Sequence, residues 1–347
     1  MLKFSLLLIN TPDAGHPPER LLQEDLEQTR IARDAGFDGV VIGQHTLAYP
    51  YQFPQPMPWL ARLCAEAPGL SFATGVLLLP LYHPADIAEQ VATLDALCGG
   101  TFRFGVGLGY RADEFSAFGL RVQDRLGRYI ESIEVIQRLW RADGPLTYEG
   151  RHFRLHNVRT ALKPVQKPRV PFWFGAHIDK AVQRTATLID PAAGDTWYAV
   201  PGTTLVEAER QMHVFRTALT ALGKPLPAEM PMRRNLYVAK DRSMALREAR
   251  PGIERAYASF RQWGNPGASA EASATSKAPA KDVEDLLTES FFIGSPEDCV
   301  RNIARFRERL GITHFVFRIQ WPGMPQTQVL RAIELFGSDV LPHVRNL

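Results

Sequence analysis

The side chain best suited to move a proton near neutral pH is His45, which follows the apolar run 37–43. A histidine at the end of a buried strand can act as a general acid or base, or can stabilise a developing negative charge. The same position also suits a structural histidine that hydrogen-bonds its neighbours. The sequence leaves both interpretations open.

Three glycines, Gly105, Gly107 and Gly109, end another apolar run. Their GxGxG spacing lacks the third glycine of the dinucleotide-binding fingerprint, so the motif does not specify a nucleotide. A strand end without side chains does let a planar ring approach the backbone closely. We therefore keep two interpretations, a cofactor platform and an ordinary glycine-rich turn.

The turn Gly175-Ala176-His177 leads from an apolar strand into a predicted helix. The unbonded N–H groups and the dipole at a helix N-terminus favour a phosphate at this position. An ordinary β-to-α connection has the same appearance, so this interpretation also stays open.

Two pairs of polar residues have helical spacing. Arg125 and Tyr129 lie four positions apart and share one helix face, which is either solvated or directed at a ligand. His152 and His156 have the same spacing, but they lack the intervening Glu of a zinc-protease helix and fall in a predicted hairpin. We predict no metal site.

A strand–helix rhythm must position these residues. Apolar runs begin near positions 2, 37, 70 and 102, about 35, 33 and 32 residues apart, which is the length of one βα unit. Each run is almost continuously apolar, as in parallel strands covered on both faces. Amphipathic helices are predicted at about 18–35 and from Pro84 to a stop at Gly99-Gly100.

The rhythm is interrupted once and then resumes. Residues 145–171 are rich in proline and turn formers, and we expect a long excursion with a small hairpin there. Later strands are predicted at 172–174, 196–200, 235–239 and 314–319, with helices to about Leu188, over roughly 203–222 and 296–310, and a last helix ending at 341–342. The stretch 264–281, dominated by Ala, Ser, Gly and Pro, predicts a mobile loop.

Eight strands favour a closed barrel over a doubly wound sheet of six or seven. We therefore predict an α/β protein with a single (β/α)8 TIM-barrel domain over residues 1–347. Active sites of such barrels gather at the carboxyl ends of the strands, where the candidates above lie. Trp197, Arg318 and Trp321 also lie at strand ends and are candidate walls of a substrate site.

Composition excludes several classes of protein. The 347 residues are 45% apolar and 22% charged, and the formal net charge is +3, so neither nucleic acid nor a membrane is an expected partner. The opening apolar run 4–9 is too short for a signal segment or a membrane span. Cys64, Cys98 and Cys299 are far apart in the sequence and contain no CxxC pair, which argues against a disulfide framework. We expect a cytoplasmic protein.

The chain resembles the luciferase-like flavin monooxygenases over nearly its whole length. The segments that carry the resemblance are 31–46 (IARDAGFDGVVIGQHT), 74–98 (TGVLLLPLYHPADIAEQVATLDALC), 102–119 (FRFGVGLGYRADEFSAFG), 125–150, 164–181 and 293–319. Several ordered motifs at family spacing are more specific than any single glycine loop.

The resemblance implies roles for individual residues. It places His45 at the active-site histidine and Gly75-Val76 at a bend that supports the flavin ring, often through a non-proline cis peptide. It also implies that the low-complexity stretch is a lid. Further cofactor contacts are implied for Gly107 beside the ring, Arg125 and Tyr129 on a helix, and Gly175, Ala176 and His177 around the flavin phosphate.

The sequence departs from the family pattern at three positions. Gln44 and Thr46 flank His45 where the family often has an acidic residue and an aromatic or second histidine. Ala176 replaces the usual second glycine of its turn. These departures leave the detailed acid–base role of His45 open.

The resulting hypothesis is a monooxygenase that uses reduced FMN, supplied by a separate flavin reductase, and O2 to oxidise a small organic substrate. One alternative is an F420-dependent oxidoreductase that transfers hydride. Another is a flavin-binding subunit without turnover. A homodimer through helices near the second and third strands is expected from the resemblance.

Overall fold

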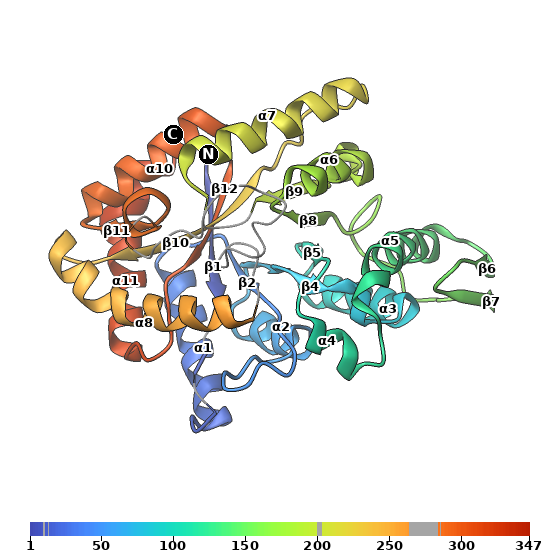
Figure 1. The fold of residues 1–347 in the computed structure, drawn as a ribbon, viewed down its shortest axis with the longest axis horizontal. Helices are drawn as coiled ribbons and strands as arrows, with labels where there is room; N and C mark the ends of the chain where they lie inside the picture. The colour runs from blue at the N-terminus through green and yellow to red at the C-terminus, as the bar shows by residue number, and fades with distance from the viewer. Residues whose placement is uncertain (10, 13, 200–202, 264–283, 285) are drawn as a thin grey trace.

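The computed structural model describes all residues except 10, 13, 200–202, 264–283 and 285. Its centre is a nearly closed barrel of parallel strands enclosed by helices (Figure 1). The barrel strands are β1 (Lys3–Leu8), β2 (Gly39–Ile42), β3 (Ser71–Thr74), β5 (Phe104–Gly107), β8 (Phe172–Ala176), β9 (Thr196–Ala199), β10 (Pro231–Val238) and β12 (His314–Arg318). The predicted eight-stranded α/β barrel is confirmed.

The sheet follows the order β3-β2-β1-β12-β10-β9-β8-β5-β4. The short strand β4 (Leu77–Leu78) pairs with β5, and β11 (Phe292–Gly294) pairs with β10. The ring closes between β3 and β5 through a bridge from Ala73 to Arg103. The Thr74 hydroxyl strengthens this junction by donating to the carbonyl of Gly105 at 2.7 Å.

Helices lie between successive strands and cover the outside of the barrel (Figure 1). The longer ones are α1 (Pro18–Asp34), α2 (Pro56–Glu66), α3 (Pro84–Leu97), α5 (Arg125–Arg141), α6 (Asp179–Leu188), α7 (Leu205–Ala221), α8 (Arg242–Gln262), α10 (Pro296–Leu310) and α11 (Gln326–Leu335). Their limits follow local chemistry. For example, α10 begins with a capping box between Ser295 and Asp298 and ends at Gly311, whose φ is 74°.

Most predicted elements agree with the structure. The expected hairpin is β6 (Leu146–Glu149) with β7 (Arg154–Val158), and the helices predicted at 18–35 and from Pro84 are α1 and α3. Two boundaries were wrong. Strand β10 begins at Pro231 instead of position 235, because its first half contains Arg233 and the buried Arg234, which interrupt the apolar pattern. The last helix is broken by a π-helical turn at Phe336–Val340 before α12 (Leu341–Val344). The predicted mobile loop lies outside the described residues.

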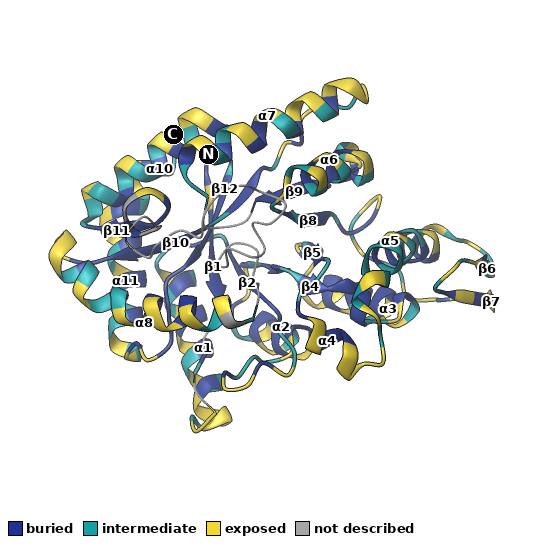
Figure 2. Ribbon diagram, viewed as in Figure 1, coloured by how far each residue is buried: buried dark blue, intermediate teal, exposed yellow. Residues whose placement is uncertain are grey.

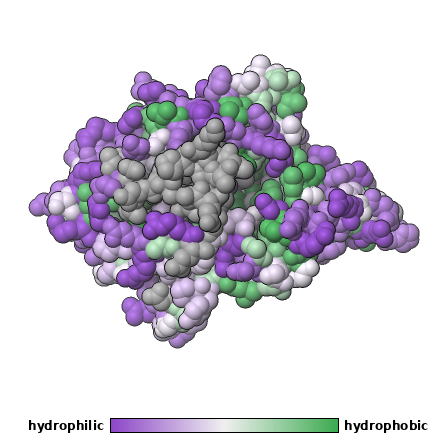
Figure 3. Space-filling view, in the orientation of Figure 1, coloured by the Kyte–Doolittle hydropathy of each residue, from purple (hydrophilic) through white to green (hydrophobic). Residues whose placement is uncertain are grey.

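Three apolar clusters are present among the described residues, and two of them pack the wall and the interior of the barrel. The larger one fills the layer between strands and helices. The smaller one lies inside the ring and consists of Leu7, Val41, Ala73, Trp173, Tyr198 and Val316. Figure 2 shows the strands buried and the outer helix faces exposed. On the face shown in Figure 3 the helices are largely hydrophilic, and apolar side chains gather beside the part that is not described.

The cysteines are all free and buried. Folding brings two of them together, since the Sγ atoms of Cys64 and Cys98 are 3.1 Å apart although the residues are distant in the sequence. Among the described residues, no helix is long and apolar enough to cross a membrane.

Candidate functional site

His45 lies just beyond β2 and is held by a buried carboxylate. Its Nδ1 is 3.1 Å from Oε1 of Glu114, and the two side chains are 15% and 1% exposed. The same oxygen accepts the backbone N–H of Thr46 at 2.9 Å. Glu114 therefore fixes both the ring and the backbone beside it, while its Oε2 is buried and accepts no hydrogen bond in the described structure.

This carboxylate comes from α4 (Ala112–Ala117), which follows β5. Arg111, the residue before α4, donates to Glu114 at 3.4 Å and to the carbonyl of Thr46 at 3.3 Å. The family often has an acidic residue next to this histidine in sequence, where this chain has Gln44 and Thr46. The structure supplies one from a different βα unit, which sequence inspection missed.

Aromatic rings enclose the exposed edge of His45. The ring centroids of Phe53, Tyr110 and Trp263 lie 5.1, 5.8 and 5.5 Å from that of the imidazole. The guanidinium of Arg111 lies over the Trp263 ring at 4.5 Å. An imidazole in such surroundings is shielded from water, so a proton on it is available mainly to a bound reactant.

The bend after β3 has the expected non-proline cis peptide, between Gly75 and Val76. A Cβ on Gly75 would lie 2.3 Å from the side chain of Val41 and 3.2 Å from the hydroxyl of Tyr198. Only glycine therefore fits, because the chain passes directly over the inner cluster.

The glycines at neighbouring strand ends have a different explanation from the one predicted. A Cβ on Gly107 would lie 2.4 Å from Val76, and one on Gly175 would lie 3.0 Å from the same side chain. The isopropyl group of Val76 occupies the space that these glycines leave. A planar group at this mouth would therefore contact Val76 and the cis peptide rather than the bare backbone of Gly107.

Gln44, which stands where the family often has an acidic residue, supports the chain segment that follows Val76. Its Oε1 accepts the backbone N–H of Leu78 at 2.8 Å, and its Nε2 donates to Gln55 at 3.2 Å and to the Tyr82 hydroxyl. An amide can accept and donate at once, which a carboxylate cannot do. Gln44 thus holds the segment after the cis peptide in place.

The predicted phosphate seat is a strand-to-helix turn, as expected. Strand β8 ends at Ala176, α6 begins at Asp179, and His177 lies between them. The His177 carbonyl accepts Gln211 at 2.6 Å, while its buried Nε2 has no hydrogen-bond partner among the described residues. Burial lowers the pKa of His177, so the ring is held neutral. Asp179 would repel an anion there, but it forms an ion pair with Arg210.

Arg125 and Tyr129 share α5 but face different partners. Arg125 donates to the carbonyl of Val122 at 2.9 Å, within the preceding turn. Tyr129 is buried and its hydroxyl is 3.4 Å from the carbonyl of Val106 in β5. Burial raises the pKa of Tyr129, so its hydroxyl stays protonated. The structure does not bring the two side chains together.

The three residues predicted to line a substrate site do not lie together in the structure. Trp197 lies on the outer side of β9, where its ring packs 5.4 Å from Phe215 of α7 and its Nε1 donates to the Ala176 carbonyl. The structure therefore does not bring it to the mouth. Arg318 and Trp321 remain together at the end of β12, with the guanidinium 5.9 Å from the indole centroid.

Sequence inspection missed two inward-facing residues beside them. Tyr198 belongs to the inner cluster, and its buried hydroxyl has no hydrogen-bond partner in the described structure. Arg233 on β10 is opposite the inner residue Val316, so it also points into the barrel. The available signal was a pair of arginines, 233 and 234, inside an otherwise apolar run.

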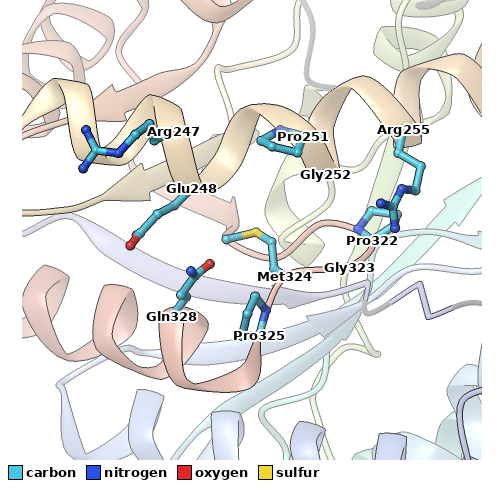
Figure 4. A pocket seen from close by; sticks show the side chains of 10 residues that line it. All are labelled: Arg247, Glu248, Pro251, Gly252, Arg255, Pro322, Gly323, Met324, Pro325 and Gln328. Atoms are coloured by element: carbon cyan, nitrogen blue, oxygen red, sulfur yellow. The ribbon is translucent and has the colours of Figure 1, made fainter.

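A separate hollow lies on the outside of the barrel, between α8 and the loop before α11 (Figure 4). Its carboxylate, Glu248, accepts the Tyr237 hydroxyl at 2.7 Å and pairs with Arg331 at 2.5 Å. Its charge is already compensated, and it shares no residue with the His45 cluster.

Comparison with known proteins now decides the family, because the luciferase-like monooxygenase model matches residues 2–314. The chain belongs to this family. A 4-hydroxyprotoasukamycin monooxygenase from Streptomyces nodosus subsp. asukaensis is 25% identical over 98% of this chain and 92% of its own length. An F420-dependent glucose-6-phosphate dehydrogenase from Microbacterium testaceum is 28% identical over 91% of each chain.

A solved member of similar fold is the oxygenating constituent of 3,6-diketocamphane monooxygenase from Pseudomonas putida, in complex with FMN. It superposes with a TM-score of 0.82 at 17% identity and covers 99% of each chain. The luciferase-like family thus includes monooxygenases and F420-dependent oxidoreductases among the relatives of this chain, and an oxidoreductase is supported.

Proposed function

We propose that this protein is a flavin-dependent monooxygenase that takes reduced FMN from a separate reductase and uses O2 to oxidise a small organic substrate. The observation that carries the proposal is the His45–Glu114 pair, which lies at the same end of the barrel as the Val76 side chain between Gly107 and Gly175. One feature can manage a proton and the other can support a ring, and the reaction requires both.

The residues at the mouth fit a planar cofactor with an anionic tail. The Val76 side chain, packed against Gly107 and Gly175, offers an apolar support. The α6 N-terminus and the unpartnered Nε2 of buried His177 offer groups for a phosphate. When bound, the reduced flavin would supply the electrons that activate O2.

The protein's own contribution is positioning, proton management and exclusion of water. Glu114 holds Nδ1 of His45, so Nε2 is the ring atom left to exchange a proton with a bound reactant. Phe53, Tyr110 and Trp263 restrict the access of water to that ring. The oxygen Oε1 of Glu114 also fixes Thr46, so the loop cannot move without disturbing the histidine.

The second candidate is F420-dependent hydride transfer. The observation that favours it is the identity of 28% to an F420-dependent dehydrogenase over 91% of this chain. A histidine fixed by a carboxylate also suits an alcohol oxidation, in which it would accept the hydroxyl proton. The third candidate is a flavin-binding subunit without turnover. Coupled consumption of reduced FMN and O2 would exclude it.

An anaerobic binding titration with reduced FMN, oxidised FMN and F420 distinguishes these candidates. We expect reduced FMN to bind most tightly. Tight F420 binding with weak FMN binding would favour hydride transfer, and binding of none would remove the cofactor assignment.

Two glycine variants test whether the flavin ring lies against Val76. Gly107→Ala would force Val76 to move and should weaken FMN binding. Gly144→Ala adds a methyl group in open space and should leave FMN binding unchanged. Equal affinities for the two variants would contradict a ring supported on Val76.

We also propose a homodimer through the helices near β2 and β3, and a cytoplasmic location. Light scattering tests the assembly, and a monomer at working concentration would contradict it.

A further inference from the structure

Two guanidinium groups lie inside the mouth of the barrel, on neighbouring strands. In the register of β10 and β12, Arg233 is opposite Val316 and Asn235 is opposite Arg318. Side chains two positions apart share a face, so Arg233, Asn235 and Arg318 all point to the same side of the sheet. Val316 belongs to the inner cluster, which makes that side the barrel interior.

Neither arginine is neutralised by the described part of the protein. Arg318 is 1% exposed, and its guanidinium donates only to neutral oxygens, those of Gln320 at 2.8 Å and Thr11 at 3.4 Å. Arg233 forms no ion pair with a described residue, and its buried Nε has no partner there. Two like charges placed together without a carboxylate destabilise the folded chain, unless something else supplies the negative charge.

The surroundings of the two arginines are donor-rich and aromatic. The hydroxyl of Tyr198 is buried without a hydrogen-bond partner among the described residues. Arg318 lies 5.9 Å from the ring centroids of both Phe260 and Trp321. Burial lowers the pKa of Arg318 to about 9, and the positive charge of Arg233 adds to this effect. Burial also lowers the pKa of Arg233. The groups that act against this lowering are tyrosine side chains, and no carboxylate is among them.

We infer that Arg233 and Arg318 form an anion subsite that binds the carboxylate of the substrate, whose apolar body lies against Phe260 and Trp321. The inference rests on the proposed function and names its substrate class, an organic acid with an aromatic or other apolar body. The subsite lies on β10 and β12, whereas the predicted phosphate seat follows β8. The same mouth therefore has separate places for an anionic substrate and for the phosphate of a cofactor.

Arg233 gives the cleaner test, because no described residue would lose a hydrogen bond when it is replaced. The probes are benzoate, its neutral analogue benzamide, and inorganic phosphate, titrated by calorimetry into the full-length protein with and without oxidised FMN. We expect the wild type to bind benzoate roughly tenfold to hundredfold more tightly than benzamide, the range for hydrogen bonds to charged groups. Arg233→Met should remove this preference, and Arg233→Lys should retain part of it.

Arg154→Gln is the matched control, since Arg154 lies on the distant hairpin with a side chain 80% exposed. It should keep the full preference for benzoate. Equal binding of benzoate and benzamide by the wild type would overturn the inference. So would an unchanged preference in Arg233→Met, or tight binding of phosphate in place of benzoate.

Thermal unfolding of the ligand-free protein provides a second, independent measurement. If Arg233 is kept for a ligand, Arg233→Met should unfold at the same temperature as the wild type or at a higher one, because an uncompensated charge has been removed. A lower unfolding temperature would assign Arg233 to the fold and overturn the inference. If FMN fails to bind while the benzoate preference persists, the result contradicts the cofactor proposal and supports the anion subsite. If Arg233→Met weakens only FMN binding, the subsite falls instead.

Discussion

At the amino ends of the barrel strands, Arg169 is 1% exposed, and its guanidinium donates to both carboxylate oxygens of Asp195 at 2.6 and 2.7 Å. At the carboxyl ends, Arg318 is equally buried but has no carboxylate partner among the described residues. Glu229, near the amino ends, likewise meets His314, Lys3 and Arg103 at 3.0, 3.1 and 3.3 Å. The amino end compensates these buried charges, whereas the carboxyl end pairs Arg111 with Glu114 but leaves Arg318 and Arg233 without a carboxylate among the described residues.

The largest expected effect is at the compensated end. Asp195→Ala leaves the buried Arg169 without its partner, and we expect a loss of about 3–5 kcal/mol in the free energy of unfolding. Arg154→Ala breaks an exposed pair and should cost less than about 1 kcal/mol. Denaturant titrations of both variants measure these values. Similar losses for the two would show that burial does not decide how much an ion pair stabilises this chain.

At the open end, the expected loss is in catalysis rather than in stability. His45→Ala should lower kcat by about 10²-fold to 10⁴-fold, the range for removing a general acid or base. The loss of stability should be smaller than in Asp195→Ala, because Glu114 keeps Arg111 and the Thr46 N–H as partners. Turnover of reduced FMN with O2 and substrate is the measurement, and full turnover would remove His45 from the mechanism.

A smaller effect is expected from the carboxylate behind the histidine. Glu114→Gln keeps the size of the side chain but removes its charge, so kcat should fall less than in His45→Ala while KM stays nearly constant. Glu149→Gln, at a surface pair with a side chain 67% exposed, is the control and should leave both constants unchanged. A change confined to KM would mean that Glu114 shapes the binding site without positioning His45.

The smallest effect concerns acid stability. Burial opposes the charge of Glu229, but the hydrogen bond and charge of His314, together with Arg103 and Lys3, hold its pKa well below the ordinary value of 4.5. A carboxyl with a lowered pKa contributes stability that is fully present above its ordinary value and is lost as the pH falls towards the folded value. Glu229→Gln should therefore cost about 1 kcal/mol at neutral pH. The difference from the wild type should shrink below pH 4.5. A difference independent of pH would assign the loss to packing.

The sequence was sufficient to predict the barrel but not all of its site. Continuous apolar runs at regular spacing reflect strands buried on both faces, and this local signal is strong. The partnership of His45 with Glu114 depends on a contact between two βα units, which no local pattern encodes. Arg233 was missed for a different reason. A charged residue inside a strand contradicts the apolar pattern, so the predicted strand began two residues after it, at 235.

Residue-level expectations failed where the direction of a side chain mattered. Trp197 and Tyr198 are neighbours on β9. The predicted residue, Trp197, points outward to the helices, whereas Tyr198 points into the barrel. A strand alternates its faces, so a shift of one position reverses the outcome.

The position of Trp263 has a practical consequence. This residue ends α8 and contacts both His45 and the Arg111 that holds Glu114. The chain has six tryptophans, and the other five are between 1% and 7% exposed, so a dissolved quencher such as iodide reaches Trp263 in preference to them. The native protein therefore carries its own optical reporter at the edge of the mouth. The arrival of a ligand beside His45 can be followed in real time without attaching a dye.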